Sequence, residues 1–277
     1  MPTDVLDLFR ITGRVAVITG GAGLLGVRHA RAISAAGGIP VLVDISSERV
    51  ESEARMLAES TGARCRGIAC DITSPEDVEA MTEAVVSEFG RVDILINNAA
   101  NNPKIGAVAD QRFTRLEHFP IEQWEADLAV GLTGAFLCSR ALGAHMATHG
   151  GGVIVNVSSD LGLVAPDQRL YRQAGVADDA QPVKPITYSV VKSGLIGLTK
   201  YLATYWADRS VRVNAICPGG VFVDQSPEFV ARLSELIPLG RMALPDEYQG
   251  ALLFLCSDAS SYMTGGTLVV DGGRTAW

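Results

Sequence analysis

Short apolar runs alternate with longer amphipathic stretches along nearly the whole chain. The runs, rich in Val, Ile and Leu, cover residues 14–19, 39–44, 64–70, 92–97, 152–159, 211–217 and 267–271. Helical stretches are expected between them, from about Leu24, over 46–60, 74–89 and 121–148, from about Thr187, and twice more before the last run. Strand, helix and strand at this spacing predict a parallel sheet with right-handed crossovers.

The apolar runs are nearly continuous, which is typical of strands covered by helices on both faces. The 277 residues contain no evident linker or repeat. We therefore predict a single domain over 1–277, an α/β doubly wound Rossmann-type fold with about seven parallel strands. One long stretch of weak periodicity, 160–187, falls between a strand and a helix, and we predict that it is a substrate loop.

A glycine-rich octapeptide, TGGAGLLG at 19–26, joins the first strand to the first helix. Glycines there allow a tight turn and a close approach of the backbone to a pyrophosphate, and the helix N-terminus offers unpaired N–H groups. The other interpretation is a glycine turn needed only for packing. The glycines fit G-x-G-x-x-G or an even G-x-x-G-x-x-G, and a third register would need a glycine at Leu24.

Carboxylates follow the second and third strands. Asp44 is placed to accept hydrogen bonds from the ribose hydroxyls of an adenosine and to repel a 2′-phosphate, which favours NAD over NADP. The alternative is a helix cap, a role for which Ser46 is also available. Asp71 and Ile72 either border the adenine, or Asp71 caps the next helix, and the sequence does not separate these two interpretations.

Tyr188 and Lys192 stand four positions apart at the start of a helix, and so share one face. A phenol has a pKa near 10 and exchanges protons poorly at neutral pH unless a neighbouring cation stabilises the phenolate. Lys192 is placed to supply that cation. Without further context, a chance pair on an amphipathic helix explains the spacing equally well.

The composition excludes several classes of function. A net charge of −8 without a long basic cluster argues against nucleic-acid or anionic-membrane partners. The five cysteines and four histidines match no metal-ligand spacing, so no metal is expected, and the thiols are expected to stay reduced in the cytoplasm. No signal peptide and no membrane-spanning run is evident.

Seven motifs occur in the order of the classical short-chain dehydrogenase/reductase family, which the chain resembles over nearly its whole length. They are the glycine loop, the Asp44 position, NNAA at 97–100, NVSS at 156–159, Tyr-x-x-x-Lys at 188–192, NAICPGG at 214–220 and YMTGGTLVVDGG at 262–273. The resemblance implies that Tyr188 exchanges a proton with a substrate hydroxyl or carbonyl. It further implies that Lys192 lowers the pKa of this phenol and that Ser159, rather than Ser158, binds the reacting oxygen.

The resemblance also implies a nicotinamide cofactor and a homotetramer. Residues expected to hold the cofactor are Gly20, Gly21, Gly23, Leu24, Leu25, Asp44, Ile45, Asp71, Ile72, Asn98, Ala99, Ala100, Tyr188, Lys192, Pro218, Gly219 and Val221. The even glycine register belongs to an extended branch that carries a substantial C-terminal substrate domain. Only a short segment ending in DGG follows the PGG stretch here, so we interpret the loop as classical with one glycine displaced.

Two positions depart from the family pattern. Gly131 stands where members usually have an asparagine in N-x-T-G, a residue thought to hold a water in the proton relay from the lysine. Asn156 or Asn101 could substitute for it, or the relay is crippled. Val223 replaces the threonine usual after the PG motif, which removes one hydrogen bond to the cofactor.

The 160–187 segment is longer than in ordinary members and rich in polar residues, which favours a polar, sugar-like or nucleotide-sugar substrate. The expected substrate contacts are Asn101, Lys104, Asp160, Arg169 and Arg172. Several short motifs also resemble a bacterial subgroup associated with flagellin glycosylation and amino-sugar pathways. The alternative for the segment is a solvated or subunit-interface loop. The alternatives for the protein are an epimerase or dehydratase that retains NAD, and a non-catalytic NAD-binding subunit.

Overall fold

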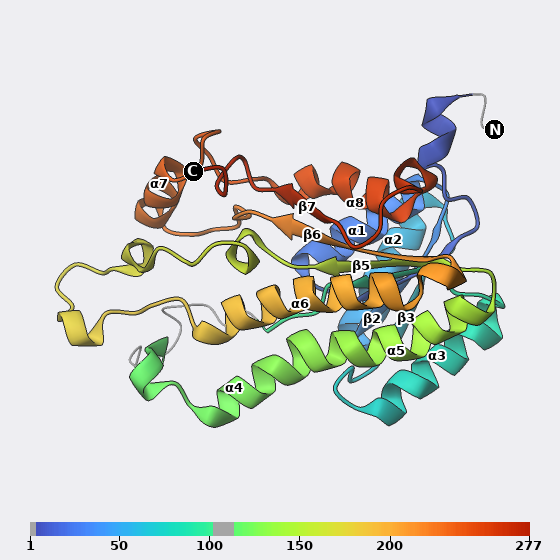
Figure 1. Cartoon of the computed structure of the whole chain (residues 1–277), viewed down its shortest axis with the longest axis horizontal. Helices are drawn as coiled ribbons and strands as arrows, with labels where there is room; N and C mark the ends of the chain where they lie inside the picture. Colours follow the sequence, from blue (N-terminus) through green and yellow to red (C-terminus); the bar gives the residue numbers. More distant parts are fainter. Residues whose placement is uncertain (1–3, 102–113) are drawn as a thin grey trace.

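A single parallel sheet forms the centre of the molecule (Figure 1). The computed structural model describes residues 4–101 and 114–277, and within them the seven strands lie in the order β3-β2-β1-β4-β5-β6-β7. Every neighbouring pair of strands is parallel. The strands are β1 (Val15–Thr19), β2 (Ile39–Asp44), β3 (Arg66–Ala69), β4 (Ile94–Asn97), β5 (Gly152–Val157), β6 (Val211–Pro218) and β7 (Thr267–Val270). The predicted doubly wound fold is confirmed, with strand ends shifted by one or two residues.

Helices cover both faces of the sheet. On one face lie α1 (Leu24–Ala35), α2 (Ser47–Thr61) and α8 (Gln249–Cys256), and on the other lie α3 (Pro75–Phe89), α5 (Gly134–Thr148) and α6 (Ile186–Tyr205). Two further helices, α4 (Ile121–Leu128) and α7 (Pro227–Glu235), lie toward the carboxyl ends of the strands (Figure 1). Among the residues described, no helix has both the length and the apolar character that a bilayer span requires.

Side chains of β1, β2, β4, β5 and β6 enter two separate hydrophobic clusters, one on each face of the sheet. Val15 and Val17 of β1 pack toward α3, α5 and α6, whereas Ala16 and Ile18 pack toward α1, α2 and α8. Burying one such large aliphatic side chain stabilises the fold by about 1.5–3 kcal/mol. The two-sided burial explains why the strands lack the apolar and polar alternation of a half-exposed sheet.

The stretch expected to be one helix over 121–148 contains a change of pitch. Between α4 and α5, residues Ala129–Thr133 form a π-helical turn, η4. Gly131 lies in this turn, and a Cβ atom added to it would stand 2.5 Å from Cγ1 of Val191 in α6. The close approach of α6 therefore requires a glycine there. Single π turns inside helices often mark functional sites.

The segment 160–187 extends from the carboxyl edge of the sheet, at the left of Figure 1. It contains three short 3-10 helices, η5 (Asp160–Gly162), η6 (Gln168–Tyr171) and η7 (Asp178–Ala180), and leads into α6. Leu170 packs there against residues of and near α7, including Leu233 and Ile237. The segment is thus an ordered wall beside the strand ends.

Candidate active site

A large cavity of about 650 Å³ opens at the carboxyl ends of the strands. Its lining comes from the ends of β1, β2, β4, β5 and β6, the start of α1 and α6, and the 160–187 segment. The strand order changes direction between β1 and β4, and such a switch point is where doubly wound sheets bind ligands. The volume is within the usual range for small-molecule and cofactor sites.

The glycine loop is shaped as a cradle beside this cavity. Gly20 has a φ of +62°, and a Cβ atom on it would lie 2.9 Å from the Cα atom of Ala99. A Cβ atom on Gly26 would lie only 2.2 Å from the carbonyl oxygen of Gly20. Gly23 is the N-cap of α1 and offers no side chain to the N–H groups of the first turn. The loop thus fits a phosphate-bearing cofactor, because these N–H groups remain available for an anion.

Most of the residues predicted for the cofactor line the cavity. Gly21 is the exception: its Cα faces β2, where an added Cβ atom would lie 2.7 Å from Cβ of Leu42. It serves helix and strand packing instead. The predicted residues in the lining are Gly20, Gly23, Leu24, Leu25, Asp44, Ile45, Asp71, Ile72, Asn98, Ala99, Ala100, Tyr188, Lys192, Pro218, Gly219 and Val221.

The two carboxylates after β2 and β3 are not helix caps. Ser46 caps α2 by accepting a hydrogen bond from Arg49 N, and Ser74 caps α3. The Asp44 carboxylate instead accepts a hydrogen bond of 3.2 Å from Ala22 N in the glycine loop. Asp71 accepts hydrogen bonds of 2.9 and 2.8 Å from the amide and hydroxyl of Thr73. Both carboxylates remain on the cavity wall, where an adenosine would meet them.

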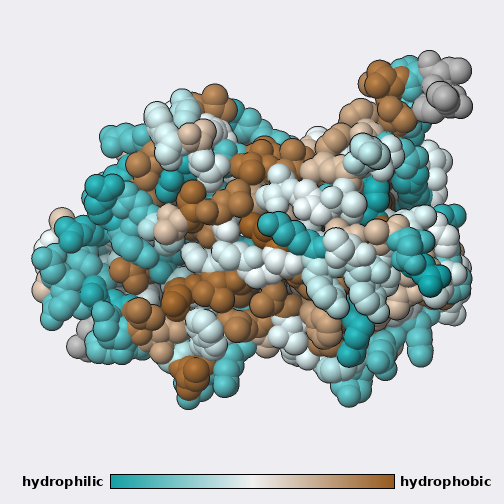
Figure 2. All heavy atoms as spheres, viewed as in Figure 1, coloured by the Kyte–Doolittle hydropathy of each residue, from teal (hydrophilic) through white to brown (hydrophobic). Residues whose placement is uncertain are grey.

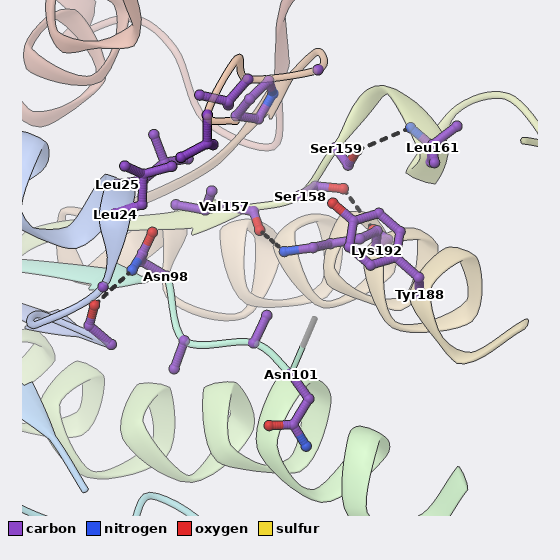
Figure 3. A pocket seen from close by; sticks show the side chains of 18 of the residues that line it. Leu24, Leu25, Asn98, Asn101, Val157, Ser158, Ser159, Leu161, Tyr188 and Lys192 are labelled. Carbon is purple, nitrogen blue, oxygen red and sulfur yellow. Dashed lines mark hydrogen bonds between the residues drawn. The ribbon is translucent and has the colours of Figure 1, made fainter. Parts of the chain in front are cut away.

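Figure 3 shows the three predicted catalytic side chains around the end of β5, with Tyr188 and Lys192 on the first two turns of α6. Lys192 is buried and its Nζ donates a hydrogen bond of 2.8 Å to Val157 O. Ser158 Oγ donates a hydrogen bond of 2.7 Å to Lys192 O, which fixes it against the helix backbone. Ser159, by contrast, is hydrogen-bonded with the Tyr188 phenol, and its predicted role of binding the reacting oxygen stays a prediction.

The environment sets the proton affinity of these groups. Burial raises the pKa of the Tyr188 phenol, and a hydrogen bond with Ser159 opposes this effect. Burial lowers the pKa of Lys192 to about 8, so its ammonium can lose a proton near physiological pH. A lysine with this pKa beside a phenol can take up or release a proton during a reaction cycle.

A second lysine lies closer to the tyrosine than the predicted one. Lys184 Nζ stands 3.8 Å from the centroid of the Tyr188 ring, whereas Lys192 Nζ stands 5.8 Å from it. Burial lowers the pKa of Lys184 to about 8. From sequence, Lys184 belongs to the polar set of the 160–187 segment that can bind hydroxyls or phosphate. Its place beside Tyr188 is not predictable, because Pro185 separates it from α6 and no helical spacing applies.

The far end of the cavity is polar. Its wall includes Asp160, Tyr171 and Arg274, of which the first is buried. Burial raises the pKa of the Asp160 carboxyl, and hydrogen bonds from Ser159 and Leu161 oppose this. Arg274, from the terminal GGRTAW stretch, has a buried Nε with no hydrogen-bond partner among the residues described. Guanidinium, ammonium and carboxylate groups together suit a ligand with several hydroxyls or an anionic group.

The predicted substrate contacts divide into three groups. Asn101 and Asp160 line the large cavity. Arg169 and Arg172 are absent from that lining, and their exposed side chains pair with Asp167 and Asp178. Lys104 lies outside the described residues. The prediction that Arg169 and Arg172 contact the substrate is therefore wrong for this cavity. The cations that line it near Asp160 are Lys184 and Arg274.

Asn156, one candidate for replacing the family asparagine, has a structural role. Its Oδ1 accepts a hydrogen bond of 2.8 Å from Asn97, and its Nδ2 donates one of 2.8 Å to Thr199 Oγ1. Asn97 also donates to Ser139 Oγ at 3.0 Å. This buried network ties β4 and β5 to α5 and α6, and both polar ends of the Asn156 amide are used in it.

Comparison with known proteins identifies the family. A model of the family described as enoyl-(acyl carrier protein) reductase matches residues 21–275. The chain is 38% identical over 273 residues to D-threitol dehydrogenase of Mycolicibacterium smegmatis, covering 96% of this chain and 95% of the relative. It is 32% identical over 272 residues to NAD-dependent glycerol dehydrogenase of Listeria innocua, covering 96% of each.

A solved structure shares the same fold and size. Gluconate 5-dehydrogenase of Burkholderia cenocepacia, in complex with NADP and tartrate, superposes with a TM-score of 0.86 at 28% identity. The match covers 99% of this chain and 100% of that one. The glycine cradle, the carboxylate of Asp44 and the set of Ser159, Tyr188 and Lys192 agree with these matches. The chain belongs to the classical short-chain dehydrogenase/reductase family and is an oxidoreductase that acts on CH–OH groups.

Proposed function

We propose that this enzyme is an NAD-dependent dehydrogenase that interconverts a secondary alcohol and a ketone on a small polyol or sugar-like substrate. The observation that carries the proposal is the layout of one cavity. The same cavity is lined by Asp44 and the glycine cradle, by Ser159, Tyr188 and Lys192, and by Asp160, Lys184 and Arg274. The threitol and glycerol dehydrogenases among its relatives support this substrate class.

The glycine cradle and Asp44 would hold the adenosine diphosphate half of the cofactor, and Pro218, Gly219 and Val221 would border the nicotinamide. The nicotinamide, when bound, accepts or supplies the hydride. In oxidation, Tyr188 takes the proton of the substrate hydroxyl while Ser159 holds the same oxygen. Lys192 stabilises the phenolate and passes the surplus proton on. In reduction the same groups act in the opposite sense.

Replacement of Asp44 by Ala should relax the preference for NAD. Asp44 repels a 2′-phosphate, and the neighbouring Arg49 lines the same cavity and donates a hydrogen bond of 2.7 Å to Ala22 O. Removing the carboxylate would leave this cation for the phosphate. We expect the ratio of kcat/KM for NAD to that for NADP to fall by about ten- to hundred-fold, or about 1.4–2.7 kcal/mol.

The control is Glu48→Ala, which removes an exposed carboxylate close in sequence to Asp44 that is absent from the cavity lining. It should leave the ratio unchanged. If Asp44→Ala also leaves the ratio unchanged in steady-state kinetics, the assignment of Asp44 to the ribose is wrong.

Replacement of Arg274 by Leu tests the substrate end of the cavity. Losing a charged hydrogen-bond donor to a substrate oxygen costs about 1.5–3 kcal/mol, so KM for the polyol should rise on the order of tenfold or more. The dissociation constant for NADH, measured by fluorescence, should not change. Arg169→Leu is the matched control, since that side chain is 81% exposed and is absent from the cavity lining. Equal effects of the two variants would refute the role of Arg274.

We also propose a cytoplasmic homotetramer. Figure 2 shows apolar residues gathered in a band across the middle of one face, where α6 and the α4–α5 helix run in Figure 1. Three large aromatic side chains on α5 and α6 are exposed, Phe136, Tyr201 and Tyr205. A partner subunit on these helices would remove this surface from water. The five cysteines are free thiols, as expected in a reducing compartment.

A further inference from the structure

A second, much smaller cavity lies beside the catalytic lysine. It is lined by Ala100, Asn101, Asp127, Gly131, Thr187, Tyr188, Val191 and Lys192. Its volume of about 10 Å³ is at the lower limit of what one water needs. The lining contains hydroxyl, amide, ammonium and carboxylate groups, which supply the two to four polar partners that a buried water needs.

The carboxylate in this lining is unusual for its burial. Asp127 is 5% exposed in α4, one helical turn before Gly131. Its Oδ2 accepts a hydrogen bond of 2.5 Å from Thr187 Oγ1, and its Oδ1 accepts one of 2.7 Å from Gln123 Nε2. A buried carboxylate costs free energy unless its partners compensate, and no basic side chain pairs with it among the residues described.

Gly131, where family members usually have an asparagine, and Asp127 line the same small cavity beside Lys192. Gly131 has no side chain to offer, and Val191 occupies the space into which one would extend. Asn156 has both ends of its amide in the buried network and does not line the small cavity. Asn101 lines it and donates a hydrogen bond of 3.4 Å to Ala126 O, with its side chain directed toward the α4–α5 helix in Figure 3.

We propose that Asp127, acting through Thr187, holds a water in the small cavity and that this water carries protons between Lys192 and the outside. Asp127 is thus a positioning residue that replaces the asparagine missing at position 131. The proposal rests on the dehydrogenase reaction proposed above. The large cavity would be filled by cofactor and substrate during turnover, which leaves the small cavity as a separate route to Lys192.

The proton balance of the route is simple. In oxidation, Tyr188 gains one proton from the substrate hydroxyl, and Lys192 must release one proton for the pair to return to its starting state. The ammonium donates this proton to the water, which in turn donates one of its own toward the Thr187–Asp127 pair. Gln123 donates a hydrogen bond to Asp127 and is half-buried, so the Thr187–Asp127 pair approaches the surface at Gln123. Reduction moves one proton inward.

Asp127→Asn tests the proposal with little change in shape. We expect kcat for polyol oxidation to fall on the order of tenfold, with KM for the polyol nearly unchanged, because proton transfer and not binding is impaired. The solvent deuterium isotope effect on kcat should rise. Glu125→Gln, an exposed acid on the same helix, is the matched control and should change neither quantity. If Asp127→Asn does not fold, Thr187→Val should give the same loss of kcat.

A rescue separates the relay from a structural role. Adding Gly131→Asn and Val191→Ala to Asp127→Asn restores the family asparagine and the space it needs, and should recover most of the lost kcat. A high-resolution crystal structure should show one water between Lys192 and Thr187. An unchanged kcat and isotope effect in Asp127→Asn, or a dry cavity, would overturn the proposal. If the unchanged enzyme oxidises no polyol, the substrate proposal fails, and the crystal structure alone decides for or against the water.

Discussion

Tyr188→Phe should abolish turnover while leaving the cofactor site intact. The variant removes one oxygen, the atom that exchanges a proton with the substrate, and general acid–base groups contribute about 10²- to 10⁴-fold to a rate. The ring stays packed against Lys184 at the start of α6, so the helix and the fold should persist. We expect kcat to fall by about this factor, with the dissociation constant for NADH, measured by fluorescence, changed less than threefold.

Tyr171→Phe is the matched control for this result. Tyr171 lines the same cavity, but no lysine stands over its ring among the residues described. Its loss should alter KM at most. If Tyr188→Phe retains its kcat, or loses NADH binding together with activity, then Tyr188 is a structural residue and the proposed chemistry is wrong.

Gly26→Ala should severely weaken cofactor binding. The added methyl carbon would lie 2.2 Å from Gly20 O and 2.9 Å from the Cα atom of Gly21, and both are backbone atoms with no rotamer to move. Relief requires α1 to shift away from the glycine loop. Overpacking of this kind costs about 1–3 kcal/mol. Because the loop and the α1 N-terminus form the cradle, we expect the NADH dissociation constant to rise by about ten- to hundred-fold.

The same methyl group can be added where the structure has room. Gly250 lies in α8 with no atom within 4 Å of an added Cβ atom. Gly250→Ala should leave NADH affinity unchanged and raise the free energy of unfolding by a few tenths of a kcal/mol to about 1 kcal/mol, since Ala is the better helix former. Unaltered NADH affinity in Gly26→Ala would mean that the cradle does not bind the cofactor.

The fold and the core of the site could be predicted because their signals are local. Each strand is a short apolar run that needs helices on both sides, so the order of runs along the chain leads directly to a doubly wound sheet. The glycine loop, Asp44 and the Tyr188–Lys192 pair are each defined by a few neighbouring residues. The carboxyl ends of parallel strands meet at one edge, which brings these separate signals to a single cavity.

The residues missed by the sequence come from elements that meet only in the fold. Arg274 reaches the substrate end from the C-terminal tail, and Asp127 meets Thr187 across α4 and α6. Polarity alone does not say which way a loop side chain points. Arg169 follows Gln168 at the start of η6, and its exposed side chain pairs with Asp167 without lining the cavity. Capping was also ambiguous from sequence, because Ser74, rather than Asp71, begins α3.

The most direct test of the central claim is the appearance of NADH absorbance when the purified protein is given NAD and a panel of three- to six-carbon polyols. We predict that NADH accumulates with at least one polyol bearing a secondary hydroxyl, and that Tyr188→Phe eliminates this signal. An epimerase or dehydratase that retains its cofactor would produce no net NADH. No NADH with any polyol, from a protein that binds NADH, would contradict the proposed dehydrogenase activity.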